Sequence, residues 1–117
     1  MAKKNKSGST QQYHVRVDLK YPSFQDQLAD LCLSELSEVL NSITKIQSMT
    51  WQQIWDTSTK TKGNKRGLNW EPLDQKTSDG KTIASIRITG KHRSRVCRDG
   101  DWMRFISLHP DHDSAYK

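Results

Sequence analysis

The C-terminal part of the chain alternates between strand-like segments and very short breaks. The strand-like segments, which combine apolar alternation with β-branched and aromatic residues, span residues 82–89, 92–98 and 102–108. Gly90-Lys91 separates the first two, and Asp99-Gly100, a dipeptide typical of tight hairpins, separates the last two. Connections this short join antiparallel neighbours, because parallel strands need a long crossover. We therefore predict an antiparallel meander.

The N-terminal part combines one strand with helices. Residues 13–20 alternate between apolar and polar side chains, which predicts a half-buried strand ending at Tyr21-Pro22. Ser23, with Asp26 three residues on, predicts the start of a helix. The apolar residues that follow at steps of three and four, and predict one long amphipathic helix, are Leu28, Leu31, Cys32, Leu36, Val39, Leu40, Ile43 and Ile46.

A second, shorter helix is predicted after Thr50, which forms a capping box with Gln53. A further extended segment at residues 68–73 and a polar turn at residues 74–81 then lead into the meander. The order predicts an α+β fold, with two N-terminal helices packed on one face of a small twisted, mainly antiparallel sheet. A chain of 117 residues with 32% hydrophobic content fits one domain with a small core. We place that domain at residues 13–117, after a disordered basic arm at residues 1–12.

The net charge of +6 and the pI of about 9.5 favour a polyanionic or acidic partner, although a basic protein without such a ligand is the alternative. No apolar run has membrane-spanning length, and the first residues lack the apolar core of a secretory signal, so we expect a cytoplasmic protein. The two cysteines, Cys32 and Cys97, lack zinc-site spacing, and we expect both to be buried.

Arginines are concentrated in the meander. Ile86 and Ile88 point to one side of their strand, and Arg87 points to the other. If the isoleucines pack on the helices, Arg87 faces outward. Arg93 and Arg95 share a face of the next strand, but the intervening break resets the phase, so alternation does not decide which face it is. Clustered arginines favour a phosphate-binding surface, with scattered arginines that bind nothing as the alternative.

A second basic group lies in the glycine-containing segment of residues 60–67, which lacks the spacing of a nucleotide-binding P-loop. It either follows a phosphate backbone or is a plain solvated connector. The residues that we predict to bind RNA in this segment and in the meander are Lys62, Lys65, Arg66, Lys91 and Arg95.

Acid–base groups stand on either side of the arginines in the sequence. Glu71 precedes Pro72 and is therefore extended. Its carboxylate either takes the proton of a ribose 2′-hydroxyl or forms an ordinary ion pair at the sheet edge. His109 and His112 lie in the C-terminal segment; a metal site there lacks a third soft ligand, so a histidine acid fits better and no metal or cofactor is expected. Tyr116 offers a ring that can stack on a base.

These stretches resemble the RelE/ParE superfamily of bacterial toxins, and most closely its YoeB-type mRNA interferases. Glu71-Pro72-Leu73 resembles the group's Glu-Pro-Leu. The residues that match its Ser-x-Arg-Ile-Thr-x-x-His-Arg stretch are Ser85, Arg87, Ile88, Thr89, His92 and Arg93. His112 and Tyr116 resemble the terminal histidine and tyrosine. The resemblance spans residues 13–116.

The resemblance implies a role for each matched residue. Glu71 would be the general base, Arg93 would bind the scissile phosphate, and Arg87 and Arg93 would stabilise the transition state. His112 would be the general acid and Tyr116 the stacking or orienting group. Because three residues separate His112 from Tyr116, where the group has adjacent residues, His109 is the alternative acid.

The implied function is that of a toxin of a type II toxin–antitoxin system, a metal-free, ribosome-dependent mRNA endonuclease that inhibits translation. The expected partners are mRNA in the ribosomal decoding site, ribosomal RNA and a cognate antitoxin. Two alternatives share the fold: a non-nuclease toxin that binds DNA gyrase, and an inactive relative that binds only RNA or an antitoxin.

Overall fold

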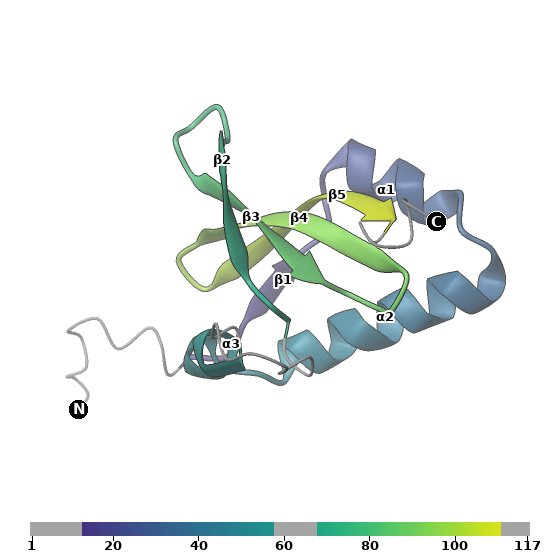
Figure 1. Cartoon of the computed structure of the whole chain (residues 1–117), viewed down its shortest axis with the longest axis horizontal. Coiled ribbons are helices and arrows are strands. Elements are labelled where there is room, and N and C mark those ends of the chain that lie inside the picture. The colour runs from purple at the N-terminus through teal and green to yellow at the C-terminus, as the bar shows by residue number, and fades with distance from the viewer. Residues whose placement is uncertain (1–12, 58–67, 111–117) are drawn as a thin grey trace.

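The structure of the protein, a computed structural model, describes residues 13–57 and 68–110. Over these residues the chain forms three helices and five strands, which confirms the predicted α+β class (Figure 1). The elements in chain order are β1 (Arg16–Asp18), α1 (Pro22–Ala29), α2 (Leu33–Gln47), α3 (Trp51–Thr57), β2 (Glu71–Lys76), β3 (Thr82–Arg87), β4 (His92–Asp99) and β5 (Trp102–Pro110).

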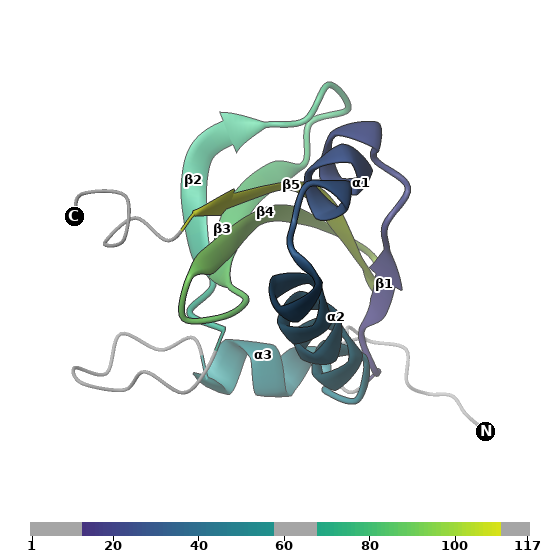
Figure 2. The same cartoon turned by 90° about the vertical axis from the view of Figure 1, so that its right-hand side faces the viewer.

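All five strands belong to one mixed sheet in the order β1-β5-β4-β3-β2. The strands β2 to β5 are antiparallel to their neighbours, as the short connections predict, and β1 alone runs parallel to its partner β5. Figure 2 shows the curved sheet arching over α2, with the helices on one side. No described helix covers the opposite side of the sheet, which we call the open side.

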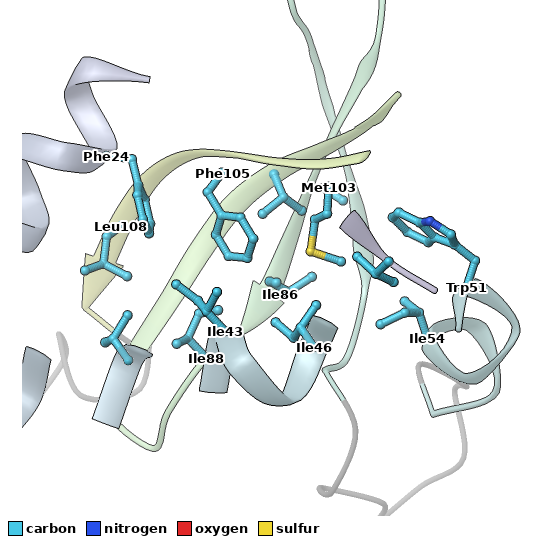
Figure 3. Close-up of a cluster of buried hydrophobic side chains, with 14 residues drawn as sticks. Phe24, Ile43, Ile46, Trp51, Ile54, Ile86, Ile88, Met103, Phe105 and Leu108 are labelled. Carbon is cyan, nitrogen blue, oxygen red and sulfur yellow. The ribbon is translucent and has the colours of Figure 1, made fainter. Parts of the chain in front are cut away.

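The core fills the space between the helices and the sheet. Buried side chains of α2 and α3, including Ile43 and Trp51, meet Ile86 and Phe105 from the sheet (Figure 3). The burial of Ile86 and Ile88 confirms that the isoleucine side of β3 faces the helices. Alternation then directs Arg87 to the open side.

The predicted long helix is wrong in one respect, because it is broken between α1 and α2. Cys32 has the extended backbone of an N-cap, with φ −68° and ψ 165°. A continuous helix over these residues would be about 39 Å long. The break instead lets α1 pack along β5, where Phe24 meets Phe105, while α2 runs under the sheet in another direction (Figure 1). As a cap residue Cys32 is exposed, so its expected burial is wrong, whereas that of Cys97 is confirmed.

Two capping predictions have different outcomes. Tyr21, rather than Ser23, is the N-cap of α1, because Pro22 occupies the first turn and fixes its φ. The hydroxyl of Ser23 instead donates to the carbonyl of Ile106, 2.6 Å away. Thr50 and Gln53 form the predicted capping box through reciprocal bonds of 2.9 and 3.2 Å.

The strands β3, β4 and β5 end within two residues of their predicted ends, whereas β1 and β2 differ more from the prediction. β1 is shorter than residues 13–20, and β2 continues to Lys76 because the polar residues predicted as a turn pair with β3. The turn itself begins at Thr77, whose hydroxyl accepts the N–H of Lys81. Within the described part of the chain, no helix is both long enough and apolar enough to span a membrane.

Candidate functional site

The strand register brings the polar side chains of four strands into two rows on the open face of the sheet. Residues paired across antiparallel strands point to the same face. One row runs across β3, β4 and β5 and consists of Arg87, Arg93 and His109. The neighbouring row runs across β2 to β5 and consists of Glu71, Ser85, Arg95 and Ser107. These residues form what we call the open-face cluster.

The turn between β3 and β4 determines which side chains of β4 lie on the open face. The hydroxyl of Thr89 accepts the backbone N–H groups of Lys91 and His92, each at 3.1 Å. From α2, Ser42 donates its hydroxyl to the carbonyl of Ile88 at 2.6 Å. These bonds make a turn after which Arg93 returns to the side of Arg87. Thr89 of the sequence motif therefore has a structural role in this turn.

Glu71 is held at the start of β2 by the residues before it. Trp70 packs edge-on against Trp55 of α3, with ring centroids 5.1 Å apart. Two residues earlier, the carbonyl of Leu68 accepts the N–H of Arg87 at 2.7 Å. The backbone entering β2 is thus attached to both α3 and β3, which places Glu71 opposite Ser85.

Arg93 contacts both a hydroxyl and a carboxylate of the cluster. Its Nε donates to Ser85 Oγ at 2.8 Å, and its Nη2 lies 3.7 Å from Glu71 Oε1. The Arg93 side chain is only 15% exposed, whereas that of Glu71 is 66% exposed. Nη2 is buried and has no hydrogen-bond partner among the described residues. The ion pair that the sequence left as an alternative for Glu71 is therefore present, but it is long and joins a fixed guanidinium to an exposed carboxylate.

The other cations of the cluster have no acidic partner in the described parts of the chain. Arg87 and Arg95 are half-buried on the open face, and neither forms an ion pair with a described carboxylate. Lys91 is exposed in the turn between β3 and β4. Of the other residues predicted to bind RNA, those of the segment 58–67 lie outside the described residues. They are Lys62, Lys65 and Arg66.

A β-bulge in β5 decides which way its last residues point. Arg95 pairs with Ser107, whereas the next residue of β4, Val96, pairs with Phe105. Ile106 is therefore skipped in the register. Alternation restarts after it, and Ser107 comes to the open face.

His109, two residues beyond Ser107, shares its face. Its Nε2 lies 2.7 Å from the hydroxyl of Ser107, which fixes the orientation of the ring. Partial burial lowers the pKa of His109 below its ordinary value of 6.5, and the positive charge of Arg95 lowers it further. The imidazole is accordingly neutral at pH 7.

The predicted catalytic residues fall into two groups. Glu71, Arg87 and Arg93 come together on the open face, as does His109, the alternative acid. His112 and Tyr116 lie outside the described residues.

The hydrogen bonds of Ser85 and Ser107 to Arg93 and His109 were not predicted from the sequence. Each serine stands two residues from a predicted functional residue on the same strand, and that spacing is the available signal. Within the described residues, no group of three or more histidine, cysteine, aspartate or glutamate side chains is placed to hold a metal ion.

The other end of the open face is electrostatically balanced. Arg104 Nη2 lies 2.9 Å from Asp99, and Arg104 Nε lies 3.5 Å from Asp18. Lys81 also pairs with Asp99, at 3.4 Å. Cys97, in the same region of the face, is buried, and this burial raises the pKa of its thiol. We call Asp18, Lys81, Asp99 and Arg104 the paired network.

The open-face cluster has the components of acid–base chemistry on a phosphodiester. The carboxylate of Glu71 on β2 and the imidazole of His109 on β5 lie on either side of three guanidiniums. The backbones of β2 and β5 are three strand spacings apart, about 14 Å. Side chains from both sides can reach a group bound between them.

A scan against protein-family models, and searches of curated proteins and of solved structures, found no match to this chain.

Proposed function

We propose that the protein is an endoribonuclease that cleaves mRNA without a metal ion, in the ribosomal decoding site, as the toxin of a type II toxin–antitoxin system. The observation that supports this most is the register that sets Glu71, Arg87, Arg93, Arg95 and His109 on one open face. The resemblance of the sequence to the YoeB-type interferases supplies the reaction and the ribosome as its setting.

In the proposed mechanism, Glu71 removes the proton of a ribose 2′-hydroxyl. The oxygen then attacks the adjacent phosphorus atom, and the bond to the 5′-oxygen of the next nucleotide breaks. Arg87 and Arg93 stabilise the additional negative charge of the transition state. A histidine donates a proton to the leaving 5′-oxygen, which leaves a cyclic phosphate and a free 5′-hydroxyl.

His109 and His112 are the candidates for this acid. The position of His109 on the open face supports its role. Its lowered pKa disfavours the protonated form in the free protein, but a phosphodiester bound by the arginines opposes the effect of Arg95 and favours protonation. Single replacements by alanine distinguish the two, since loss of the acid should slow cleavage about 100-fold or more and loss of the other histidine should not.

The ribosome is proposed as the second binding surface. Lys91 is exposed beside the cluster, and Arg95 extends its charge across β4. Together with Lys62, Lys65 and Arg66 of the basic segment, these residues would hold ribosomal RNA through phosphate contacts. This binding would act in the cytoplasm, where mRNA is translated.

A cognate antitoxin is proposed as the protein partner. Leu33 and Leu40 of α2 are 81% and 41% exposed, and their spacing of seven residues places them on one side of the helix. Changing both to glutamate should abolish protection by the antitoxin while cleavage persists. If protection persists as well, the antitoxin is better placed over the open-face cluster.

Primer extension on cellular transcripts after brief induced expression tests the nuclease proposal. The native chain should create new 5′ ends within translated codons, and Arg93→Ala should not. Arg16→Ala is the matched control, because it removes an equal charge from a side chain that is 64% exposed at the far end of the sheet. It should cut like the native chain.

Two other outcomes contradict cleavage. Intact transcripts with arrested growth would indicate a toxin that acts by binding a target such as DNA gyrase. Intact transcripts with normal growth would indicate an inactive relative that only binds RNA or an antitoxin.

A further inference from the structure

The acidic partner of Arg93 among the described residues is the carboxylate of Glu71. Nη2 of Arg93 is buried and has no hydrogen-bond partner in the described residues, although a guanidinium N–H strongly favours one. Its nearest acidic atom, Glu71 Oε1, is 3.7 Å away, which is too far for a good hydrogen bond. The N–H is therefore directed at an anion without being fully satisfied.

A phosphodiester can contact this buried nitrogen only after a neighbouring side chain moves. Ser85 is an unsuitable candidate, because its hydroxyl is half-buried in the sheet and bonded to Nε. Glu71 lies on the edge strand β2, and its side chain is 66% exposed. Its rotation toward solvent costs one long, exposed ion pair, which is a weak interaction.

We propose that Glu71 and an RNA phosphodiester exchange places on Arg93, while Ser85 holds the guanidinium in position throughout the exchange. Ser85 is then a positioning residue, and Glu71 has a second role as an occupant that the substrate displaces. The ligand rests on the proposed function, because the phosphodiester is that of single-stranded RNA.

The exchange would leave the carboxylate of Glu71 close to the phosphodiester whose adjacent 2′-hydroxyl it deprotonates. A phosphodiester that takes the place of the carboxylate at Nη2 remains within reach of the displaced Glu71 side chain on the adjoining strand. The carboxylate is separated from its cation only when an RNA phosphate is present. Coupling of this kind would keep the base paired in the free protein and release it beside the 2′-hydroxyl.

Binding of an uncleavable probe tests the exchange in the full chain. A suitable probe is a single-stranded oligouridine whose riboses all carry 2′-O-methyl groups, because it retains the phosphodiesters but lacks the attacking hydroxyl. Fluorescence anisotropy at low salt gives its affinity. Glu71→Gln should bind the probe about two- to fivefold more tightly than the native chain, since an exposed ion pair of ordinary strength no longer competes.

Asp74→Asn is the matched control, because it removes the same charge from the same strand at an exposed position outside the cluster. If Glu71→Gln binds no more tightly than Asp74→Asn, the gain comes from net charge alone and the exchange is wrong. A weaker complex with Glu71→Gln would also overturn it.

Nuclear magnetic resonance of the arginine Nε–H groups tests the role of Ser85, with the signal of Arg93 assigned by its loss in Arg93→Lys. The signal should be protected from solvent exchange in the native chain and should stay protected when the probe is added. Ser85→Ala should lose this protection and bind the probe more weakly, and Ser85→Thr, which keeps a hydroxyl, should restore both. Protection that survives in Ser85→Ala would exclude the positioning role.

None of these measurements requires cleavage. A chain that leaves transcripts intact but shows tighter binding for Glu71→Gln would retain the exchange and contradict the nuclease. A chain that cuts mRNA without tighter binding would retain the nuclease and contradict the exchange.

Discussion

Arg93 and Arg104 lie on the same open face, and each has a buried side-chain nitrogen without a hydrogen-bond partner among the described residues. Their surroundings differ. Arg104 pairs with Asp99 at 2.9 Å and with Asp18, whose side chain is only 11% exposed, at 3.5 Å. Among the residues that the structure describes, Arg93 has a single acidic partner, the exposed Glu71, at 3.7 Å.

The charge balance of the two regions differs in the same way. The paired network sets two cations, Lys81 and Arg104, against two carboxylates. The open-face cluster sets three arginines against the single carboxylate of Glu71 within the described residues. An arginine enclosed by carboxylates stabilises the sheet, whereas a surplus of guanidiniums on an exposed face is available to an anion.

Replacing Arg93 by alanine is the strongest test of this contrast. Cleavage should fall by a factor of about 100 to 1,000 or more, because one donor to the transition-state charge is lost. The free energy of unfolding should fall by only about 0.5–1 kcal/mol, the worth of the hydrogen bond to Ser85, since the ion pair lost among the described residues is long and exposed on one side. Cleavage by translating ribosomes and thermal unfolding measure the two effects. A large loss of stability would show that Arg93 has the structural role assigned to Arg104.

Replacing Arg104 by alanine should produce the opposite result. The free energy of unfolding should fall by about 1–2 kcal/mol, because Asp18 and Asp99 lose the cation that they share. The folded fraction should still cleave normally, which can be assayed well below the unfolding temperature. Arg104→Lys, which keeps the charge but loses the fork geometry, should recover part of the stability. An unaltered unfolding temperature in Arg104→Ala would contradict the structural role of the network.

Replacing Gln27 by alanine tests how the bulge in β5 is held. Its Oε1 accepts the N–H of Leu108 at 2.7 Å, so the variant should lose about 1 kcal/mol of stability. Amide hydrogen exchange should accelerate at Leu108. Gln52→Ala is the control, because among the described residues its side chain bonds only to the exposed Asp56 within α3, and it should cost less. Equal effects of the two variants would show that the bulge does not depend on α1.

The smallest expected effect concerns the pH dependence of stability. The pKa of His109 is lowered in the folded chain, so the unfolded chain binds more protons as the pH falls below about 6.5. Stability is therefore full above that value and declines as the pH falls through the folded-state pKa. His109→Gln should reduce this decline in denaturant unfolding at pH 7 and pH 5. Arg95→Gln, which removes only the second cause, should give an intermediate slope, and a steeper slope in either variant would contradict the assigned shift.

Much of the sheet follows from local signals in the sequence. The short breaks at Gly90-Lys91 and Asp99-Gly100 predicted the meander, because two-residue connections join antiparallel strands. The apolar alternation of β3 predicted which of its sides faces the helices. The long helix was predicted without its break at Cys32, because the apolar period continues through the break. Packing requires the change of direction there, since α1 packs against β5 and α2 packs near β1.

The candidate site was less accessible to prediction. Residue types and spacing left the roles of Glu71 and the arginines open, and the resemblance to a known family nominated Glu71, Arg87 and Arg93. Alternation determined that Arg93 and Arg95 share a face, but the turn at Thr89 decided that this face is the open one, through hydrogen bonds that no period reveals.

By itself the sequence determined the fold class, the order of the antiparallel strands and the residue types that can act on a phosphodiester, because these depend on periodicity, turn chemistry and composition. Only the tertiary structure decided that His109 joins the arginines. The bulge at Ile106 shifts the register by one residue, and α1 bonds to the β5 backbone there, Ser23 to the carbonyl of Ile106 and Gln27 to the N–H of Leu108. Side chains alternate with a period of two, so a shift of one residue moves every later side chain to the opposite face.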